Sequence, residues 1–316
     1  MGGVDKKMKL SIIVCAYNEE KGIGTLLSNL SEQKLPPEID DYEIIVVASG
    51  CTDRTVPIVK EFMTKNPKIR LIEEEERRGK ASAMNKAIEA ASGEILVFVP
   101  ADVLPVKDGL YHLILPFRDP KITVVSGRPM QHPKFRNRGL MGHLACMTYQ
   151  IWEKLMVTLN DAGLAAHCSG EFMAMRAGVV DKIPEECAAE DSYISVIARR
   201  KGFIKFSPKA IAYNVMPSNI RDYINQRRRW LYGHFQTRKL TGEYPTVMDT
   251  LIFSKTITAL KILKDEIAGN LGKIHFFFAA ILIEAVIYCL AAIDFLLKRQ
   301  YAIWPVIKST KVSFDD

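Results

Sequence analysis

Residues 93–102 read Gly93-Glu94-Ile95-Leu96-Val97-Phe98-Val99-Pro100-Ala101-Asp102. Five apolar residues run without a break from Ile95 to Val99, which is typical of a strand buried on both faces inside a parallel sheet. Pro100 cannot donate to a strand ladder, so it ends the run. Ligands of open α/β sheets bind beyond the carboxyl ends of the strands, which makes Asp102 a candidate ligand of a substrate or metal. A turn-capping role is the alternative for this carboxylate taken alone.

The same alternation of strand and helix surrounds this stretch. We expect strands at 9–16, 42–47 and 69–72. We expect helices at 23–30, from the turn at 48–53 to about residue 65, and at 81–92, and a loop at 36–41. Four alternations within a hundred residues predict a parallel, doubly wound α/β sheet. In the second half we expect strands at 122–127 and within 202–215, and helices at 141–159, from Glu190 onward and through 226–230.

Composition bounds the class of protein. The 316 residues, 48% hydrophobic and 25% charged, suffice for one large domain with an appendage or for two domains. A net charge of +7 suits an anionic partner, namely nucleotide phosphates, nucleic acid or an acidic membrane surface. The basic clusters lack interleaved stacking aromatics, so we expect no nucleic-acid partner. Six cysteines without a CxxC pair favour free thiols in the cytosol. No signal peptide is expected at 1–9.

The end of the chain has a different character. Residues 274–297 are mostly apolar and long enough to span a bilayer, but they include Glu284 near the middle and Asp294. A charge near the centre of a span costs roughly 2.5–3.5 kcal/mol. The alternatives are a true span with a partner for Glu284, an interfacial helix, or a buried hairpin helix; we favour membrane association. Residues 248–268 carry apolar positions and Lys255, Lys261 and Lys264, as an interfacial amphipathic helix does.

Several separated motifs resemble one family. They are the strand and turn at 11–20, the strand and turn at 46–55, the helix start at 79–85, Pro100-Ala101-Asp102 in place of D-x-D, the acidic pair Glu190-Asp191, and Gln226-Arg227-Arg228-Arg229-Trp230 as a full Q-x-x-R-W. In this order over residues 9–235 they resemble family 2 glycosyltransferases, the inverting nucleotide-sugar enzymes with the GT-A fold. Q-x-x-R-W is found in the membrane-linked, often processive members.

The resemblance implies a set of site residues. The donor nucleotide sugar is expected to contact Ala16, Tyr17, Asn18, Glu19, Ser49, Lys80, Asn85, Ala101, Asp102 and Arg229. The acceptor is expected to contact Ser169, Gly170, Glu171, Gln226 and Trp230. A divalent metal, Mn²⁺ or Mg²⁺, is expected on Asp102 and the donor phosphates, because glycosyl transfer must neutralise a diphosphate leaving group. Asp191, with Glu190 beside it, is expected to be the general base that deprotonates the acceptor hydroxyl.

Two departures from the family pattern leave the nucleotide undecided. The turn after the second strand carries Ala48-Ser49 where the family usually has aspartates, and Pro100 replaces the first acid of D-x-D. A UDP-sugar is the default donor and a GDP-sugar the alternative. The departures also admit a catalytically degenerate, glycosyltransferase-like membrane scaffold. A nucleotidyltransferase and a dinucleotide-binding oxidoreductase are disfavoured, because the turn after the first strand has no glycine.

Simpler interpretations accompany four features of the sequence. Glu190-Asp191 suits the positive end of a helix dipole, and Gln226 to Trp230 alone suits an exposed basic helix. His167-Cys168 lacks a second pair at metal-ligand spacing, so packing or acceptor contact is favoured over a metal. The acidic run at 73–76 is expected to be a solvated loop.

Together these observations predict three segments. Residues 1–240 form a GT-A catalytic domain, 241–273 interfacial amphipathic helices, and 274–316 a hydrophobic, membrane-spanning helix with its tail. The chain is expected at the cell membrane with the catalytic domain facing the cytoplasm, and the acceptor is a lipid-linked or glycan hydroxyl. One hydrophobic segment does not build a polymer channel, which favours simple transfer over synthesis with export.

Overall fold

The computed structural model describes residues 7–136, 139–165, 167–254, 256–269 and 274–314. Its strands are β1 (Met8–Ala16), β2 (Ile39–Ser49), β3 (Ile69–Glu74), β4 (Ile95–Phe98), β5 (Leu104–Pro105), β6 (Ile122–Gln131), β7 (Met173–Arg176) and β8 (Phe203–Asn214). Its helices are α1 (Ile23–Ser31), α2 (Thr55–Lys65), α3 (Lys80–Ala90), α4 (Gly109–Ile114), α5 (Gly139–Asp161), α6 (Glu190–Lys201), α7 (Ile220–Thr241), α8 (Met248–Ser254), α9 (Thr256–Gly269) and α10 (Ile274–Leu296).

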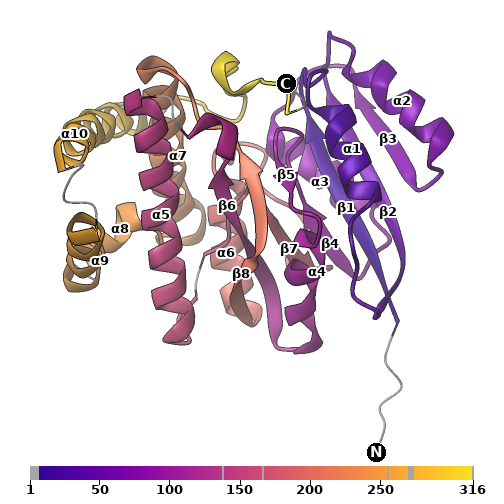
Figure 1. Ribbon diagram of the computed structural model, residues 1–316, viewed down its shortest axis with the longest axis horizontal. Helices are drawn as coiled ribbons and strands as arrows, with labels where there is room; N and C mark the ends of the chain where they lie inside the picture. Colours follow the sequence, from indigo (N-terminus) through magenta and orange to yellow (C-terminus); the bar gives the residue numbers. More distant parts are fainter. Residues whose placement is uncertain (1–6, 137–138, 166, 255, 270–273, 315–316) are drawn as a thin grey trace, which may run out of the picture.

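Within the described residues the strands form one eight-stranded sheet in the order β3-β2-β1-β4-β7-β6-β8-β5 (Figure 1). The first four are mutually parallel, as the alternation of strands and helices predicts. β7 then runs antiparallel to both β4 and β6, and β8 returns parallel to β6. The α/β prediction is confirmed, and the antiparallel β7 at the centre is an addition that the sequence pattern did not reveal.

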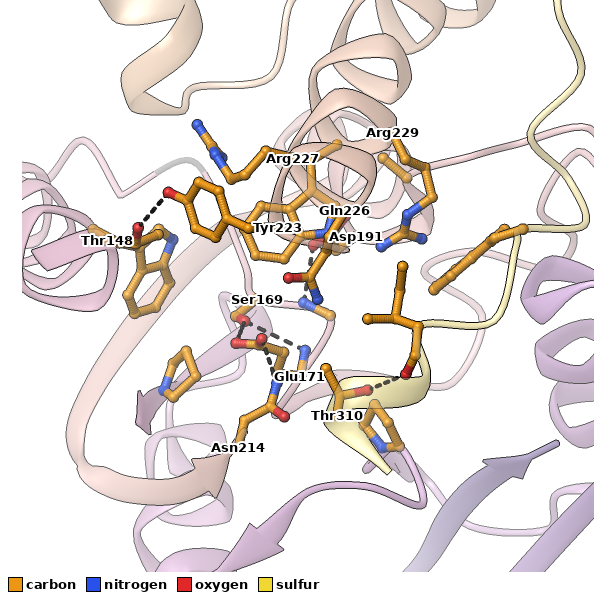
Figure 2. Close-up of a pocket in the computed structure, with 18 of the residues that line it drawn as sticks. Thr148, Ser169, Glu171, Asp191, Asn214, Tyr223, Gln226, Arg227, Arg229 and Thr310 are labelled. Atoms are coloured by element: carbon orange, nitrogen blue, oxygen red, sulfur yellow. Dashed lines mark hydrogen bonds between the residues drawn. The ribbon is translucent and has the colours of Figure 1, made fainter. Parts of the chain in front are cut away.

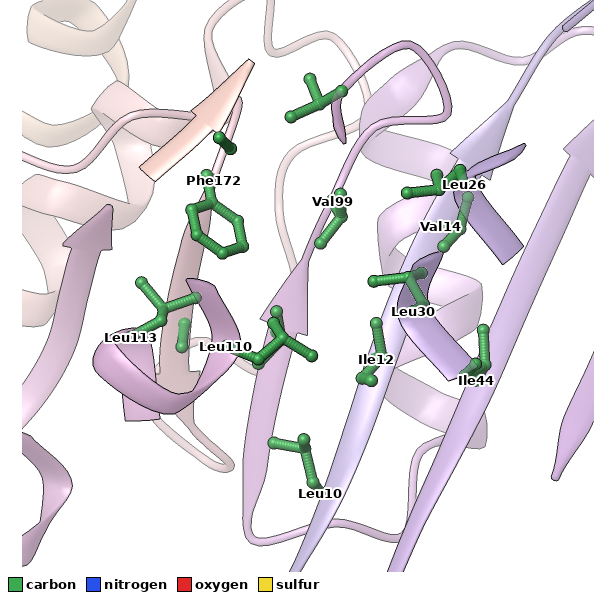
Figure 3. Packing of buried hydrophobic residues seen from close by; sticks show 14 of the residues in the cluster. Leu10, Ile12, Val14, Leu26, Leu30, Ile44, Val99, Leu110, Leu113 and Phe172 are labelled. Atoms are coloured by element: carbon green, nitrogen blue, oxygen red, sulfur yellow. The ribbon is translucent and has the colours of Figure 1, made fainter. Parts of the chain in front are cut away.

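Two apolar layers sandwich the sheet. One face packs against leucines of α1 and α4, with Leu26, Leu30, Leu110 and Leu113 buried beside β1, β2 and β4 (Figure 3). The opposite face packs against α3 and α6. All four residues of β4 are buried, which confirms the expected two-sided burial of this strand. The strand therefore holds its carboxyl end, and the turn with Asp102, on a rigid base.

Two predicted loops are wrong in part. β2 begins at Ile39, so Asp40 and Asp41 belong to the strand and not to a loop. Asp41 lies opposite Lys9 of β1 and accepts ion pairs from Lys9 at 3.4 Å and Lys68 at 3.1 Å, which offset the low strand propensity of aspartate. β3 likewise extends through Glu74, which is buried and bound by Ser82 at 3.0 Å and Lys86 at 3.2 Å.

The C-terminal helices α8, α9 and α10 pack beside α5 and α7 at one end of the sheet (Figure 1). Within the described residues one helix, at 275–296, is long and apolar enough to cross a membrane by its length and composition. Only 22% of that segment is buried. The exposed face carries Phe278, Leu282 and Leu296, each more than 60% exposed. Such exposure disagrees with the alternative of a buried hairpin helix.

Residues 248–268 are helical in α8 and α9, which lie on either side of position 255. Ala259 and Ile262 face inward against Leu155 and Leu159 of α5. Lys261 and Lys264 are exposed, in agreement with the predicted polar face, and Lys255 lies outside the described residues.

Both carboxylates of α10 have arginine partners on α7. Glu284 accepts hydrogen bonds from Arg227 Nε at 2.9 Å and Nη2 at 3.0 Å. Asp294, fully buried, is bound by Arg228 and by Arg299 at 3.2 Å. A buried carboxylate is tolerated only when it is paired in this way. The partner required for Glu284 is therefore present.

We expect Asp294→Leu to lower the free energy of unfolding by about 3 kcal/mol, because it leaves Arg228 partly buried without its counter-charge. The double variant Arg228→Met/Asp294→Leu removes both charges and should lose less than the single variant. Denaturant unfolding in detergent micelles measures both. A double variant that is less stable than Asp294→Leu would show that the pair does not act as a unit.

Candidate active site

One cavity of about 640 Å³ lies at the carboxyl ends of β1, β2 and β4. Ala16 ends β1, Ser49 ends β2 and Asp102 follows β4, and all three line the cavity. The first turns of α3 and α6, one face of α7, side chains of α5, α8, α9 and α10, and the segment after α10 also form its walls. Figure 2 shows part of this lining, including Thr148 of α5, Asp191 of α6 and Arg229 of α7. This is the location at which open α/β sheets bind ligands.

All but two of the predicted site residues line this cavity. They are Ala16, Tyr17, Glu19, Ser49, Lys80, Ala101, Asp102, Ser169, Gly170, Glu171, Glu190, Asp191, Gln226, Arg229 and Trp230. Residues separated by more than two hundred positions in the chain therefore meet in one place.

Asn18 and Asn85 are the two predicted donor contacts that do not line the cavity. Asn18, at φ 51°, accepts a hydrogen bond from the Thr52 N–H at 2.8 Å and donates to the Thr52 hydroxyl at 3.2 Å. Asn85 exchanges two hydrogen bonds of 2.8 Å with the backbone of Ile183. Both side chains are occupied in joining loops, so they position the walls of the cavity.

The donor side of the cavity holds a carboxylate without a direct partner. Asp102 has no hydrogen bond or ion pair among the described residues, and Arg229 acts on it only as a nearby positive charge. Its negative charge reaches Glu19, whose pKa is raised to about 7 by burial and by Asp102, against the opposing effect of Lys311. Excess negative charge of this kind, facing a cavity, favours the binding of a cation.

Two cations face the carboxylates from the other walls. Lys80, at the start of α3, donates to the Gly170 carbonyl at 3.2 Å and lies 3.9 Å from Glu190. Arg229 is buried on α7, and burial lowers its pKa to about 10 despite the nearby charges of Glu190 and Asp191. With a pKa of about 10 Arg229 is cationic at neutral pH, and the two basic side chains together suit an anionic ligand.

Asp191 lies in the first turn of α6 and faces the cavity (Figure 2). Its Oδ2 accepts a hydrogen bond from the Gly170 N–H at 3.0 Å, and its Oδ1 accepts one from the Ser192 N–H at 2.7 Å. Burial alone would raise the pKa of Asp191, but His167, Lys80 and the Gly170 N–H outweigh it and lower the pKa. The carboxylate is therefore ionised and able to accept a proton.

Glu190 differs from its neighbour in both contacts and charge. It is buried, and burial raises its pKa although Lys80 and Arg229 oppose the shift. Its Oε1 has no hydrogen-bond partner among the described residues. Both acids lie in the first turn of α6, so they also suit the positive end of the helix dipole, as the simpler interpretation states, although no side chain makes a cap hydrogen bond to this helix.

Glu171 closes the opposite side of the turn that carries Ser169 and Gly170. Its carboxylate accepts hydrogen bonds from Asn214 at 2.6 Å, Tyr149 at 3.0 Å and Ser169 at 3.4 Å (Figure 2). Burial raises the pKa of Glu171 to about 7, since it outweighs the hydrogen bonds from Tyr149 and Asn214. The side chain is thus held in one orientation at the cavity wall.

Three consecutive arginines of α7 point in different directions. Arg227 contacts Glu284 and Asp249, Arg228 contacts Asp294, and only Arg229 approaches the acidic pair. Successive helix residues are about 100° apart, which produces this divergence. Gln226 also lines the cavity, and its Oε1 has no hydrogen-bond partner among the described residues.

The segment after α10 is a part of the site that the sequence analysis missed. Trp304 lies under the Arg229 guanidinium, 3.2 Å from its carbon to the ring centre. Lys311 donates to the Tyr17 carbonyl at 2.7 Å and pairs with Glu19. Gly79, at φ 98°, allows the close approach of Ala302, whose carbonyl oxygen would lie 2.2 Å from an added Cβ. Nothing in the local pattern around these residues marks them as site residues.

His167 and Cys168 are buried and bind Ser195, with His167 Nδ1 3.3 Å from the hydroxyl. Burial lowers the pKa of His167 to about 4 and raises that of Cys168 to about 12. In the described part of the chain no three His, Cys, Asp or Glu side chains gather as a metal centre. The packing interpretation of this pair agrees with these contacts.

Comparison with known proteins identifies a family that this chain matches. The model of glycosyl transferase family 2 matches residues 11–184. Poly-beta-1,6-N-acetyl-D-glucosamine synthase of Staphylococcus aureus (strain COL) is 27% identical over 272 residues, which cover 81% of this chain and 63% of that protein. The synthase of Staphylococcus epidermidis is 27% identical over 231 residues, covering 71% and 54%. The chain thus spans less than two thirds of the length of these relatives.

Solved structures share the fold. A mannosyltransferase, PcManGT, from Pyrobaculum calidifontis, in complex with GDP-Man and Mn²⁺, aligns with a TM-score of 0.63 at 23% identity over 93% of this chain and 88% of that one. Residues 1–349 of S. aureus TarS, in complex with UDP-GlcNAc, align with a TM-score of 0.50 at 22% identity over 72% and 67%. The expected GT-A fold is confirmed.

Glu171 makes stability depend on pH. Its folded pKa of about 7 lies above the ordinary 4.5, so the folded protein holds a proton that the unfolded chain releases, and stability falls as pH rises from 4.5 to 7. Glu171→Gln removes the titrating carboxyl group. As the pH rises from 5 to 8, its free energy of unfolding should therefore increase by on the order of 2 kcal/mol relative to that of the wild type. Denaturant unfolding across that range measures the gain. The exposed Glu89→Gln is the control, and a parallel response of both variants would refute the assignment.

Proposed function

The chain belongs to glycosyl transferase family 2 and is a glycosyltransferase; from this premise we propose that it moves a sugar, with inversion, from a nucleotide-diphosphate donor to a hydroxyl acceptor. The observation that carries the proposal is the meeting of Asp102, Asp191, Lys80 and Arg229 in one cavity at the strand ends. The first two supply negative charge for a metal and a proton acceptor. The last two supply positive charge for a leaving diphosphate.

The donor is a UDP- or GDP-sugar held at the turns after β1, β2 and β4. Ala16, Tyr17, Ser49 and Ala101 line that part of the cavity, and Arg77 lies over the Tyr17 ring at 4.0 Å. The fold neighbours in complex with GDP-Man and with UDP-GlcNAc support a nucleotide-sugar donor without deciding between the two bases.

A divalent cation fits the donor side. Asp102 offers carboxylate oxygens with no hydrogen bond or ion pair among the described residues, and burial together with the charge of Asp102 raises the pKa of the neighbouring Glu19 to about 7. Such hard oxygen ligands suit Mn²⁺ or Mg²⁺, and the donor phosphates would complete the coordination. When bound, the cation neutralises charge on the diphosphate leaving group. Asp102 would hold it, with Lys80 and Arg229 beside the phosphates.

The acceptor hydroxyl lies at Asp191, which takes its proton as the new glycosidic bond forms. The hydrogen bond from the Gly170 N–H orients the carboxylate, and its lowered pKa keeps it ionised. Attack by the hydroxyl on the face of the sugar opposite the diphosphate inverts the anomeric centre in one displacement. Ser169, Gly170, Glu171, Gln226 and Trp230 form the acceptor wall, with the Trp230 ring available to stack on a sugar.

The acceptor is a lipid-linked or glycan hydroxyl, and the enzyme acts at the cytoplasmic face of the cell membrane. The exposed apolar face of α10, with Glu284 neutralised by Arg227, supports a membrane-spanning position for that helix. The named polysaccharide synthases among the relatives support a glycan product of the same general class.

Asp102→Asn tests the donor site. In the wild type we expect calorimetric binding of UDP or GDP that requires Mn²⁺, and in the variant we expect at least about a tenfold rise in Kd, because a neutral amide is a weaker metal ligand. Asp181→Asn, at an exposed carboxylate outside the cavity, should bind like the wild type. If neither nucleotide binds the wild-type protein with Mn²⁺ or Mg²⁺, the proposed enzyme function fails.

Asp191→Asn separates catalysis from donor binding. Loss of the general base should lower kcat by about 10²–10⁴-fold, while the Kd for the nucleotide changes little. Glu190→Gln serves as the matched variant, since it makes the same carboxylate-to-amide change at the neighbouring acid, and we expect a smaller fall in kcat. The reverse order of effects would transfer the base role to Glu190.

A further inference from the structure

The active-site cavity has a second, apolar part that the proposed chemistry does not use. Beyond Asp191 and Trp230 its walls are formed by side chains of α9, of α10 and of the residues before α8. This apolar wing is lined by Val247, Met248, Leu263, Ile267, Phe277 and Ile281. The wing is continuous with the polar part, since both belong to the same cavity.

The wing is bounded by the helix proposed to span the membrane. Phe277 and Ala280 face inward and are 7% and 8% exposed, whereas Ile281 lines the same cavity and is 61% exposed. Ala285, one turn further along, is also both exposed and part of the cavity wall. The wing therefore reaches the outer, apolar face of α10, which carries Phe278 and Leu282.

The charges between the two parts of the cavity are internally balanced. Arg227 binds Glu284 at 2.9 Å and Asp249 at 3.0 Å, and Asp249 lies 3.4 Å from His234. In the described wall of the wing this leaves no unpaired cation to receive an anionic headgroup. An uncharged, hydroxyl-bearing headgroup meets no electrostatic obstacle here.

We propose that the acceptor is a hydroxyl-bearing glycolipid or lipid alcohol, with its hydroxyl at Asp191 and its hydrocarbon chain in the apolar wing, entering past α10 from the bilayer. This inference rests on the proposed transferase function and names its acceptor class. A glycan chain in the wing would leave its hydroxyls against aliphatic side chains, whereas a hydrocarbon chain removes apolar surface from water there. A phosphate acceptor is already ionised and has no need of the base that Asp191 supplies.

The probes are alkyl β-glucosides from butyl to decyl, below their micellar concentrations, titrated into the full chain in lipid nanodiscs with UDP, GDP and Mn²⁺ present. Binding should tighten by up to about fourfold for each added methylene that enters the wing. A decyl glucoside with a diazirine at the chain end should label residues of α9 and α10, as mapped by mass spectrometry. Dodecyl phosphate should bind more weakly than dodecyl glucoside.

Ala285→Trp fills the mouth of the wing from an exposed position, so the fold should tolerate it. We expect it to flatten the chain-length dependence and abolish labelling, with nucleotide binding unchanged. Ala292→Trp is the matched control on the same helix, because Ala292 is exposed and lines a different pocket. It should retain the graded binding and the labelling.

The outcomes separate this inference from the proposed function. A flat alkyl series, or labelling outside α9, α10 and the wall residues Val247 and Met248, in a protein that binds its nucleotide with Mn²⁺ overturns the lipid acceptor alone. Tighter binding of dodecyl phosphate overturns the hydroxyl headgroup. Equal effects of Ala285→Trp and Ala292→Trp overturn the assignment of the wing. Absence of metal-dependent nucleotide binding overturns the transferase itself.

Discussion

Negative charge confined to one cavity is the constraint on which the site depends. Glu19, Asp102, Glu171, Glu190 and Asp191 all line it. Carboxylates cannot remain ionised together in a partly buried space unless cations or hydrogen-bond donors compensate them. Lys80, Arg229 and Lys311 supply part of that compensation from three different elements. At Glu19 and Glu171 burial outweighs that compensation, and the pKa of each rises to about 7.

The two carboxylates of α6 differ because their surroundings differ. His167, Lys80 and the Gly170 N–H outweigh the effect of burial on Asp191 and lower its pKa, whereas burial dominates at Glu190 and raises its pKa. Adjacent acids in one helical turn thus acquire pKa shifts of opposite direction. The buried β4 strand holds the turn with Asp102 at the same cavity.

Helix α7 connects this chemistry to the helix proposed for the membrane. One face presents Gln226, Arg229 and Trp230 to the cavity, while Arg227 and Arg228 bind the two carboxylates of α10. The same pairing removes the main objection to a membrane position for α10, since Glu284 is not left as an uncompensated charge. Because α10 also forms a wall of the cavity, the catalytic carboxylates and the exposed apolar face belong to one continuous structure.

Local pattern in the sequence was enough to determine the α/β class, the buried β4 strand, the turn with Asp102, the acidic start of α6 and the Q-x-x-R-W helix, because each depends on neighbouring residues. Only the tertiary structure decided the rest. It brought Lys311 to Glu19 and Trp304 to Arg229, and it paired Arg227 and Arg228 with the carboxylates of α10. Asn18 and Asn85 bind backbone groups of other loops. Asp40, Asp41 and Glu74 lie within strands. Those outcomes depend on partners distant in the chain. The partner of a side chain, more than its residue type, determines whether the side chain faces the cavity or supports the fold.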